Sequence, residues 1–167
     1  YSIGANYLLN ENQSVFGRHS KGGRANADRL LFGSAVLPSG QALSGLSADM
    51  VTQTELGFKH KKDNFSLFAT GFMANTSEQN WDFAGGSPRE IQREYQAFGL
   101  ELESYYSFKK FDVSGSVTWT KAEIKEDFFS PQFEGNTPRR QADFIYNANA
   151  SYKFGKESNH IVGLSII

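Results

Sequence analysis

Apolar and polar residues alternate with a period of two over long stretches of this chain. Between residues 111 and 120, every odd position is apolar or glycine and every even position is polar. Residues 146–154 repeat the pattern with aromatic residues and alanines at even positions, and residues 98–103 continue it. Because successive side chains of a strand point to opposite faces, this pattern predicts strands with one apolar and one polar face.

The alternation and its interruptions predict an all-β fold of about eight strands. Most of these segments are longer than the roughly 5–6 residues of an ordinary globular strand. Several reach the roughly 9–11 residues that a tilted strand needs to cross a bilayer. The expected strands are Tyr1–Leu9, Ser14–Lys21, Val51–His60, Phe65–Asn75, Glu94–Ser107, Phe111–Glu123, Ala142–Phe154 and His160–Ile167.

Short and long polar connections alternate between these strands. The short ones are Asn10–Gln13, Lys61–Asn64, Phe108–Lys110 and Gly155–Asn159, and the long ones are Gly23–Met50, Thr76–Arg93 and Ile124–Gln141. In an antiparallel up-and-down meander, alternate connections fall on the same end of the sheet. One rim therefore carries tight turns and the other long loops, which is the layout of a transmembrane β-barrel wall in the outer membrane.

The amino-acid composition favours β-strands and does not indicate nucleic-acid binding, a cofactor or a metal site. The 167 residues include 17 basic and 18 acidic side chains, and this balance offers no basis for nucleic-acid binding. There is no cysteine, and the three histidines show no metal-ligand spacing, so neither a cofactor nor a metal is expected. An aromatic content of 14%, with 16 glycines, suits strands better than helices.

Two carboxylates on one strand, Glu101 and Glu103, invite comparison with the acidic pair of a glycosidase. Residues at i and i+2 of a polar strand face also line a hydrated lumen, where charge costs little. The chain has no phosphate-binding glycine loop, nucleophile elbow or metal triad. We therefore expect no enzymatic activity and treat both residues as candidate lumen contacts.

Further ligand-binding candidates lie in the expected long loops. Arg24, with Lys21 and Arg29, forms a basic cluster that would attract an anionic ligand or lipopolysaccharide phosphates, although solvated loop residues are the alternative. Exposed aromatic residues on long loops are candidate contacts for a small-molecule substrate, or they pack the loops against one another. These are Trp81, Phe83, Phe128, Phe129 and Phe133.

Four segments resemble, in order, blocks of TonB-dependent outer-membrane receptors. They are FGRHSKGGR, TQTELGFKHKKDNFSLFATGFMANTSEQNW, EYQAFGLELESYYSFKKFDVSGSVTWTKAEI and GNTPRRQADFIYNANASYKFGK. The shared pattern is a Glu-x-Gly-x-Lys strand, a tight turn and a Phe-rich return, followed by a Gly-x-Glu-x-Glu strand and a second aromatic return. The resemblance covers most of the chain and is weakest over 25–50.

The resemblance implies part of a receptor that imports iron–siderophore complexes or similar nutrients across the outer membrane of a Gram-negative bacterium. Its expected partners are the TonB system, a plug domain, and membrane lipid or lipopolysaccharide. Such barrels have about 22 strands. Residues 1–167 are therefore expected to be a partial barrel domain, without the plug and the C-terminal strands.

Two other architectures stay open at this stage. A complete small eight-stranded outer-membrane barrel would pair its first and last strands. A soluble lipocalin-like barrel or sandwich would turn its apolar faces inward to bind a small ligand. In the receptor interpretation the lipid face holds Leu56, Phe58, Phe98, Leu100, Leu102, Val113, Val117, Tyr146 and Tyr152. The lumen face holds Glu55, Lys59, Glu101, Glu103, Ser114, Ser116, Thr118, Asn147 and Asn149.

Overall fold

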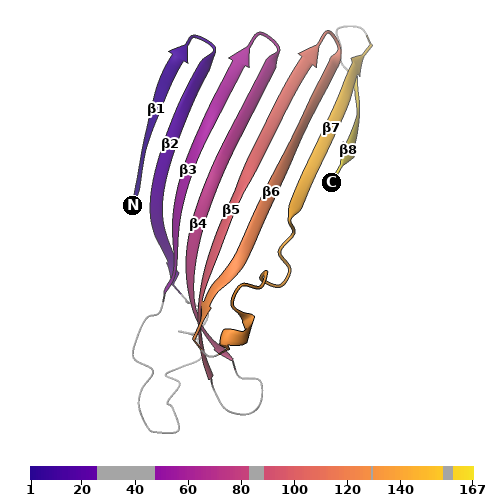
Figure 1. Ribbon diagram of the computed structural model, residues 1–167. Coiled ribbons are helices and arrows are strands. Elements are labelled where there is room, and N and C mark those ends of the chain that lie inside the picture. The colour runs from indigo at the N-terminus through magenta and orange to yellow at the C-terminus, as the bar shows by residue number, and fades with distance from the viewer. Residues whose placement is uncertain (26–47, 83–88, 129, 156–159) are drawn as a thin grey trace.

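The computed structural model describes residues 1–25, 48–82, 89–128, 130–155 and 160–167. They form one antiparallel sheet in which the strands follow one another in chain order (Figure 1). This confirms the predicted all-β meander. The elements are β1 (Ser2–Asn10), β2 (Gln13–Ala25), β3 (Ala48–Lys62), β4 (Phe65–Asp82), β5 (Arg89–Phe108), β6 (Phe111–Asp127), the 3-10 turn η2 (Pro131–Phe133), β7 (Phe144–Phe154) and β8 (His160–Ile166).

Strands β2 to β6 extend beyond their expected ends on the long-loop side, whereas β7 begins two residues later than expected. β4 and β5 have 18 and 20 residues and pair continuously from Phe65↔Tyr106 to Asp82↔Arg89. The expected loop over Thr76–Arg93 is therefore wrong for most of its length. Both faces of this outer part of the hairpin carry polar residues. Apolar and polar residues therefore no longer alternate along the sequence, although the backbones of the two strands remain paired.

At the other end, the expected tight turns over Asn10–Gln13, Lys61–Asn64 and Phe108–Lys110 were placed correctly. The expected turn over Gly155–Asn159 lies mostly outside the described residues. Asp63 and Lys109 open two-residue turns with positive φ angles of 49° and 54°. Such angles are typical of the primed turns whose twist matches that of paired strands. At the first turn, the Asn10 side chain accepts a hydrogen bond from the backbone N–H of Asn12 at 2.9 Å.

The pairing register sorts side chains to the two faces as the sequence predicts. One row across β3 to β6 contains Phe58, Ala69, Leu102 and Val117, and the next row contains Lys59, Phe68, Glu103 and Ser116. All nine expected lipid-face residues share one face, and all nine expected lumen residues share the other.

Within the part of the chain that the structure describes, no second layer packs on the apolar face. Among the described residues, the buried hydrophobic side chains are Ala122 and Ile124, whereas Leu56 is 69% and Leu100 is 59% exposed. No helix in this part of the chain is long and apolar enough to cross a membrane. A soluble sandwich would bury its apolar face against a second layer, and the described residues contain none.

Aromatic side chains border the apolar face at two levels. Near the tight turns, Tyr106 stacks on Phe108 and Phe111 packs on Tyr152. Towards the long loops, Phe98 meets Trp119 edge to face at 5.8 Å. Residues 98 and 108 lie on one strand, so a rise of about 3.3 Å per residue and a tilt of about 40° separate the levels by about 25 Å. That is the height of the apolar band of an outer-membrane barrel.

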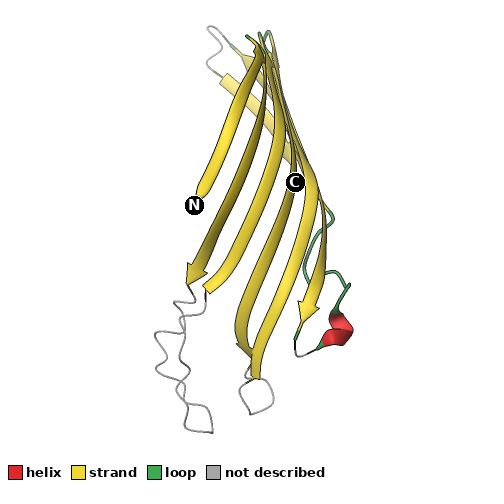
Figure 2. Cartoon of the chain, turned by 60° about the vertical axis from the view of Figure 1, so that its left-hand side comes forward, coloured by secondary structure: helices red, strands yellow, loops and turns green. Residues whose placement is uncertain are grey.

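The sheet is curved and open (Figure 2). β8 pairs with β7, and β1 pairs with β2, but the described strands β1 and β8 do not pair with each other. The described residues therefore do not form the closed eight-stranded barrel that was one alternative.

Candidate functional site

The polar face of the sheet carries the charged and hydroxyl side chains that the alternation predicted. Glu101 and Glu103 project from β5 and are exposed. Glu103 borders a hollow of about 390 Å³, where hydroxyl and amide groups of β4, β6 and β7 converge. Within it, the Asn147 amide donates a hydrogen bond to Ser116 Oγ. This surface offers donors and acceptors to a polar solute or to a protein domain.

An ion pair joins β2 to β3 on the same face. Arg18 donates two hydrogen bonds to Glu55, at 2.7 and 2.9 Å, and Gln53 donates a third at 2.7 Å. Arg18 remains half exposed, so the pair orients two charged groups towards the lumen side more than it stabilises the sheet.

Aromatic rings also lie on this polar face, each beside a glycine of the next strand. A Cβ added to Gly57 would overlap the Phe16 ring, and one added to Gly99 would overlap the Phe72 ring. The Lys59 ammonium lies 4.6 Å from the centre of the Phe16 ring. The glycines thus let the rings lie flat across neighbouring strands, covering backbone that would otherwise be open.

A polar cluster closes the tight-turn end of the lumen face. Asp112 accepts hydrogen bonds from Tyr105 at 2.9 Å and Ser107 at 2.6 Å, and it pairs with Lys153 at 2.6 Å. These contacts connect the β5–β6 hairpin to β7, so they hold three strands together at this rim.

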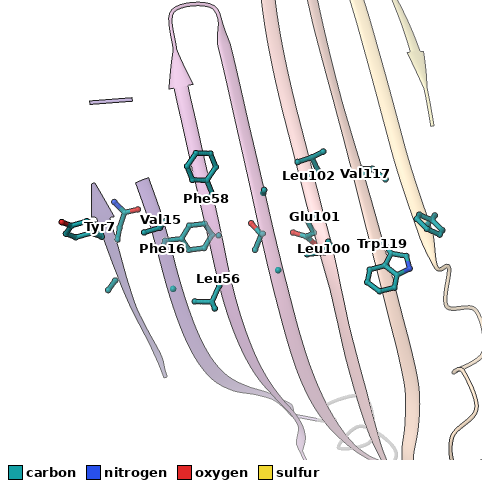
Figure 3. Close-up of a pocket in the computed structure, with 18 residues that line it drawn as sticks. Tyr7, Val15, Phe16, Leu56, Phe58, Leu100, Glu101, Leu102, Val117 and Trp119 are labelled. Carbon is teal, nitrogen blue, oxygen red and sulfur yellow. The ribbon is translucent and has the colours of Figure 1, made fainter. Parts of the chain in front are cut away.

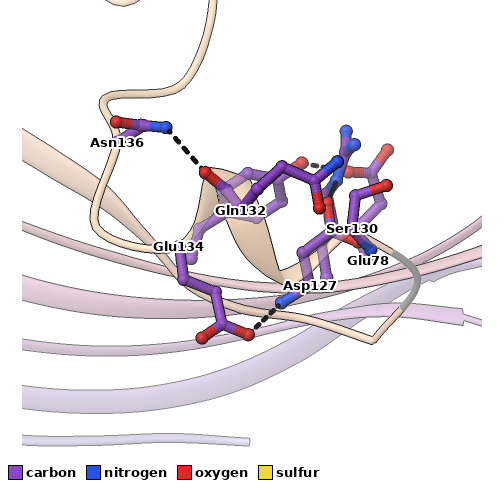
Figure 4. A network of polar contacts seen from close by, with 8 residues as sticks. Glu78, Asp127, Ser130, Gln132, Glu134 and Asn136 are labelled. Atoms are coloured by element: carbon purple, nitrogen blue, oxygen red, sulfur yellow. Dashed lines mark hydrogen bonds and ion pairs between the residues drawn. The ribbon is translucent and has the colours of Figure 1, made fainter.

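A second cluster lies at the long-loop end, where β4, β5 and β6 meet the segment after β6 (Figure 4). The Asp127 side chain is 1% exposed and pairs with Arg93 Nε at 2.6 Å. Asp127 also accepts a hydrogen bond from the Ser130 backbone N–H at 2.9 Å. The Tyr95 hydroxyl donates to Glu78 at 2.6 Å.

The chain after β6 folds back against the end of that strand. The Gly135 N–H donates to the Ile124 carbonyl at 2.8 Å, and the Ile124 N–H donates to the Asn136 carbonyl at 2.9 Å. Glu134 accepts a hydrogen bond from the Asp127 backbone at 3.2 Å. This segment, including η2, is therefore fixed to the wall.

Both ionisable donors of the loop-end cluster have perturbed pKa values. Burial and the hydrogen bond to the Glu78 carboxylate raise the pKa of Tyr95 to about 12, so its hydroxyl stays protonated at neutral pH. Burial alone would lower the pKa of Arg93, but the contacts with Asp127 and Tyr95 raise it overall. At neutral pH the cluster thus contains a charged guanidinium and a neutral phenol.

The structure describes only some of the remaining ligand-binding candidates from the sequence. Arg24 and Trp81 belong to β2 and β4 and not to loops, and their side chains are outside the described set. Phe83 and Phe129 lie outside the described residues altogether. Phe128 follows β6 directly and is 56% exposed. The backbone of Arg24, Trp81 and Phe128 lies at the long-loop ends of β2, β4 and β6.

The loop-end cluster was missed because β5 was expected to begin at Glu94, just after Arg93, and β6 was expected to end at Glu123, before Asp127. Polar residues occupy both faces around Arg93, Glu94 and Gln96, so the alternation of apolar and polar residues gave no signal there. No group of three or more histidine, aspartate or glutamate residues in the described part of the chain could hold a metal ion.

An open antiparallel wall with tight turns at one rim, extended hairpins at the other and an apolar band about 25 Å high defines a segment of a transmembrane β-barrel. A family model described as TonB dependent receptor-like, beta-barrel matches residues 1–164. The chain therefore belongs to this family, whose members are outer-membrane transporters of Gram-negative bacteria and not enzymes. The family assignment favours the interpretation of Glu101 and Glu103 as wall residues.

Solved structures of receptors share the fold. The FrpB iron transporter from Neisseria meningitidis has a TM-score of 0.71 at 18% identity, covering 98% of this chain and 25% of that one. The ferric yersiniabactin uptake receptor FyuA from Yersinia pestis has a TM-score of 0.69 at 17% identity, with coverages of 92% and 22%. The copper transporter OprC has a TM-score of 0.68 at 13% identity, covering 92% of this chain and 24% of that one.

The chain spans about a quarter of the length of these structures. At such low identities the similarity establishes the fold alone. A comparison with curated protein sequences finds no match.

Proposed function

We propose that this chain is part of the barrel wall of a TonB-dependent receptor in the outer membrane of a Gram-negative bacterium. The receptor would import an iron–siderophore complex or a similarly scarce nutrient. The supporting observation is the separation of faces: an exposed apolar band between two aromatic levels on one side, and charged and hydroxyl groups on the other.

The plug domain and the remaining strands would come from the rest of the receptor. The polar face would then line a lumen shared with the plug, and energy would reach the site through TonB. Lipid and lipopolysaccharide would cover the apolar face. The loop-end residues proposed for ligand contact are Arg24, Trp81, Phe83, Phe128 and Phe129, with Glu101 and Glu103 deeper in the lumen.

Neighbouring residues on β6 offer a sharp test of the membrane arrangement. This chain has no cysteine, so Ser116→Cys and Val117→Cys can be compared in an intact receptor from which any other cysteines have been removed. A membrane-impermeant maleimide, applied to opened outer-membrane fragments, should label position 116 and leave position 117 unlabelled until the protein is unfolded. Equal labelling of both positions would contradict the assignment of the faces.

Transport is tested separately in cells. Deleting the receptor gene should abolish uptake of one labelled ferric siderophore from a panel, and restoring the gene should recover uptake only where TonB is functional. Labelled copper belongs in the same panel, because one structural neighbour is a copper transporter. Uptake that persists without TonB would overturn the proposed mechanism.

A further inference from the structure

Two adjacent arginines, Arg139 and Arg140, lie on the segment that connects β6 to β7. The sequence has two other pairs of adjacent lysine or arginine residues, Lys61–Lys62 and Lys109–Lys110. Both lysine pairs lie at the tight-turn end of the sheet, whereas the arginine pair follows the long-loop end of β6 (Figure 1). An endoprotease can recognise such a pair, because each cation enters a separate acidic pocket. The surroundings of the three pairs decide which of them a protease can reach.

The arginine pair lies within residues 137–142, an exposed arch between two anchors on β6. Before the arch, the Ile124 N–H donates a hydrogen bond to the Asn136 carbonyl at 2.9 Å. After it, the Thr120 N–H donates to the Asp143 carbonyl at 2.9 Å. Both anchors lie beyond Trp119, which belongs to the outer aromatic level, so the arch is outside the apolar band. The arch itself belongs to no helix or strand.

The backbone of the arch is weakly held. Arg139 and Arg140 are the central residues of a turn that is closed by a hydrogen bond from the Gln141 N–H to the Pro138 carbonyl. This bond is 3.4 Å long, beyond the usual range for N–H···O bonds. Arg140 has a φ angle of 65°, a left-handed conformation that is unfavourable for a residue with a Cβ atom. Extending the arch therefore breaks one weak bond and relieves an unfavourable backbone angle.

The side chains of the arginine pair are available to a partner. Both are exposed, and neither forms a hydrogen bond or an ion pair with another residue that the structure describes. Exposed segments outside helices and strands are preferred sites of proteolytic nicking. A protease binds the chain in an extended form, which the arch can adopt between its two anchors.

The two lysine pairs lack this freedom. Lys61 and Lys62 belong to β3 and are paired with β4. Lys109 and Lys110 form the whole turn between the paired ends of β5 and β6. Extending either lysine pair into a protease would separate paired strands. They therefore serve as internal controls for the arginine pair.

We propose that the peptide bond between Arg139 and Arg140 is a processing site, cut at the cell surface by an endoprotease with acidic pockets for both guanidinium groups. Water adds across the bond, leaving a carboxylate on Arg139 and an ammonium group on Arg140. The inference rests on the proposed function, because that function places the long-loop rim outside the cell. β6 and β7 stay paired up to Trp119↔Phe144, so the cut receptor keeps its wall.

The test uses intact receptor isolated from outer membranes of growing cells of the source bacterium. Mass spectrometry of the chain ends should find one fragment that ends at Arg139 and one that begins at Arg140. Arg139→Gln and Arg140→Gln should each reduce the cut fraction severalfold. Lys109→Gln, which removes one cation of a pair held in a tight turn, is the matched control and should leave the cut fraction unchanged.

A second measurement adds an endoprotease specific for paired basic residues to the purified, folded receptor. We expect cleavage at the arginine pair, and at the two lysine pairs only after heat unfolding. Cleavage of the folded receptor at the lysine pairs as fast as at the arginine pair would contradict the inference.

Receptor from growing cells that is uncut within the arch, or cut equally in wild type and both arginine variants, would overturn the processing site. Fractionation of the cells comes first and separates the two proposals. A receptor absent from the outer membrane refutes the proposed function itself. A correctly located, transporting receptor that stays uncut refutes only the processing site.

Discussion

Arg93 and Asp127 form an ion pair across β5 and β6, with 2.6 Å between Nε and Oδ2, at the point where the wall meets the segment that follows β6. The carboxylate is almost completely covered, while the guanidinium remains 28% exposed. Asp127 also anchors the Ser130 backbone. One side chain thus joins a strand end to the segment that follows it.

Removing Asp127 should release the segment after β6. Asp127→Ala leaves the Arg93 charge partly buried and removes the carboxylate that accepts from the Ser130 N–H, which keeps its bond to the backbone carbonyl of residue 127 at 3.2 Å. Breaking a buried ion pair in this way costs roughly 3–5 kcal/mol. Hydrogen exchange at the Gly135 amide, which donates to Ile124, should accelerate strongly. Lys125→Ala, which removes an exposed charge from the same strand end, is the control and should leave exchange at Gly135 unchanged.

An introduced charge should destabilise the receptor more on the apolar face than on the polar face. Leu102 is near the middle of the apolar band, so Leu102→Arg should lower the free energy of unfolding of the intact receptor by about 2–4 kcal/mol. Ser116→Arg, on the polar face of the adjacent strand, should change it little. Urea titration in lipid vesicles measures both, and similar losses from the two variants would refute the facing assignment.

Gly99 should not tolerate a side chain. A Cβ there would overlap the Trp119 carbonyl and the Phe72 ring, so Gly99→Ala should destabilise the sheet by about 1–3 kcal/mol. Gly22, on β2, has no atom within 4 Å of the corresponding position, and Gly22→Ala should be neutral or slightly stabilising. The temperature at which the folded band disappears in semi-native electrophoresis reports both changes.

Tyr95 should make the loop-end cluster sensitive to strongly alkaline pH. Its pKa is raised from 10.0 to about 12, so its contribution to stability is complete below about pH 10 and is lost as pH rises through about 12. The tyrosinate absorbance of wild type minus Tyr95→Phe should show one transition near pH 12. A difference spectrum that titrates near pH 10 would show that the contact with Glu78 does not form.

Expectations from the sequence were accurate where the two faces of the sheet meet different solvents. Around Leu102 and Val117 one face of the sheet is apolar and the other polar, so the residue types alternate and the sequence predicts the strand. Near Glu78 and Arg93 both faces meet water, the alternation fades, and only backbone pairing reveals the strand. The loop-end cluster was missed for that reason.

The chain by itself determined the strand number, the tight turns, the facing of the eighteen wall residues and the resemblance to a receptor family, because these depend on local periodicity and turn chemistry. Tertiary structure decided which distant residues meet. Asp127 reaches Arg93, and Phe72 covers Gly99, only because cross-strand register brings them together. The hollow of about 1010 Å³ on the apolar face (Figure 3) is likewise a product of register, since its small residues Ala5, Gly17, Ala69 and Gly71 come from three different strands.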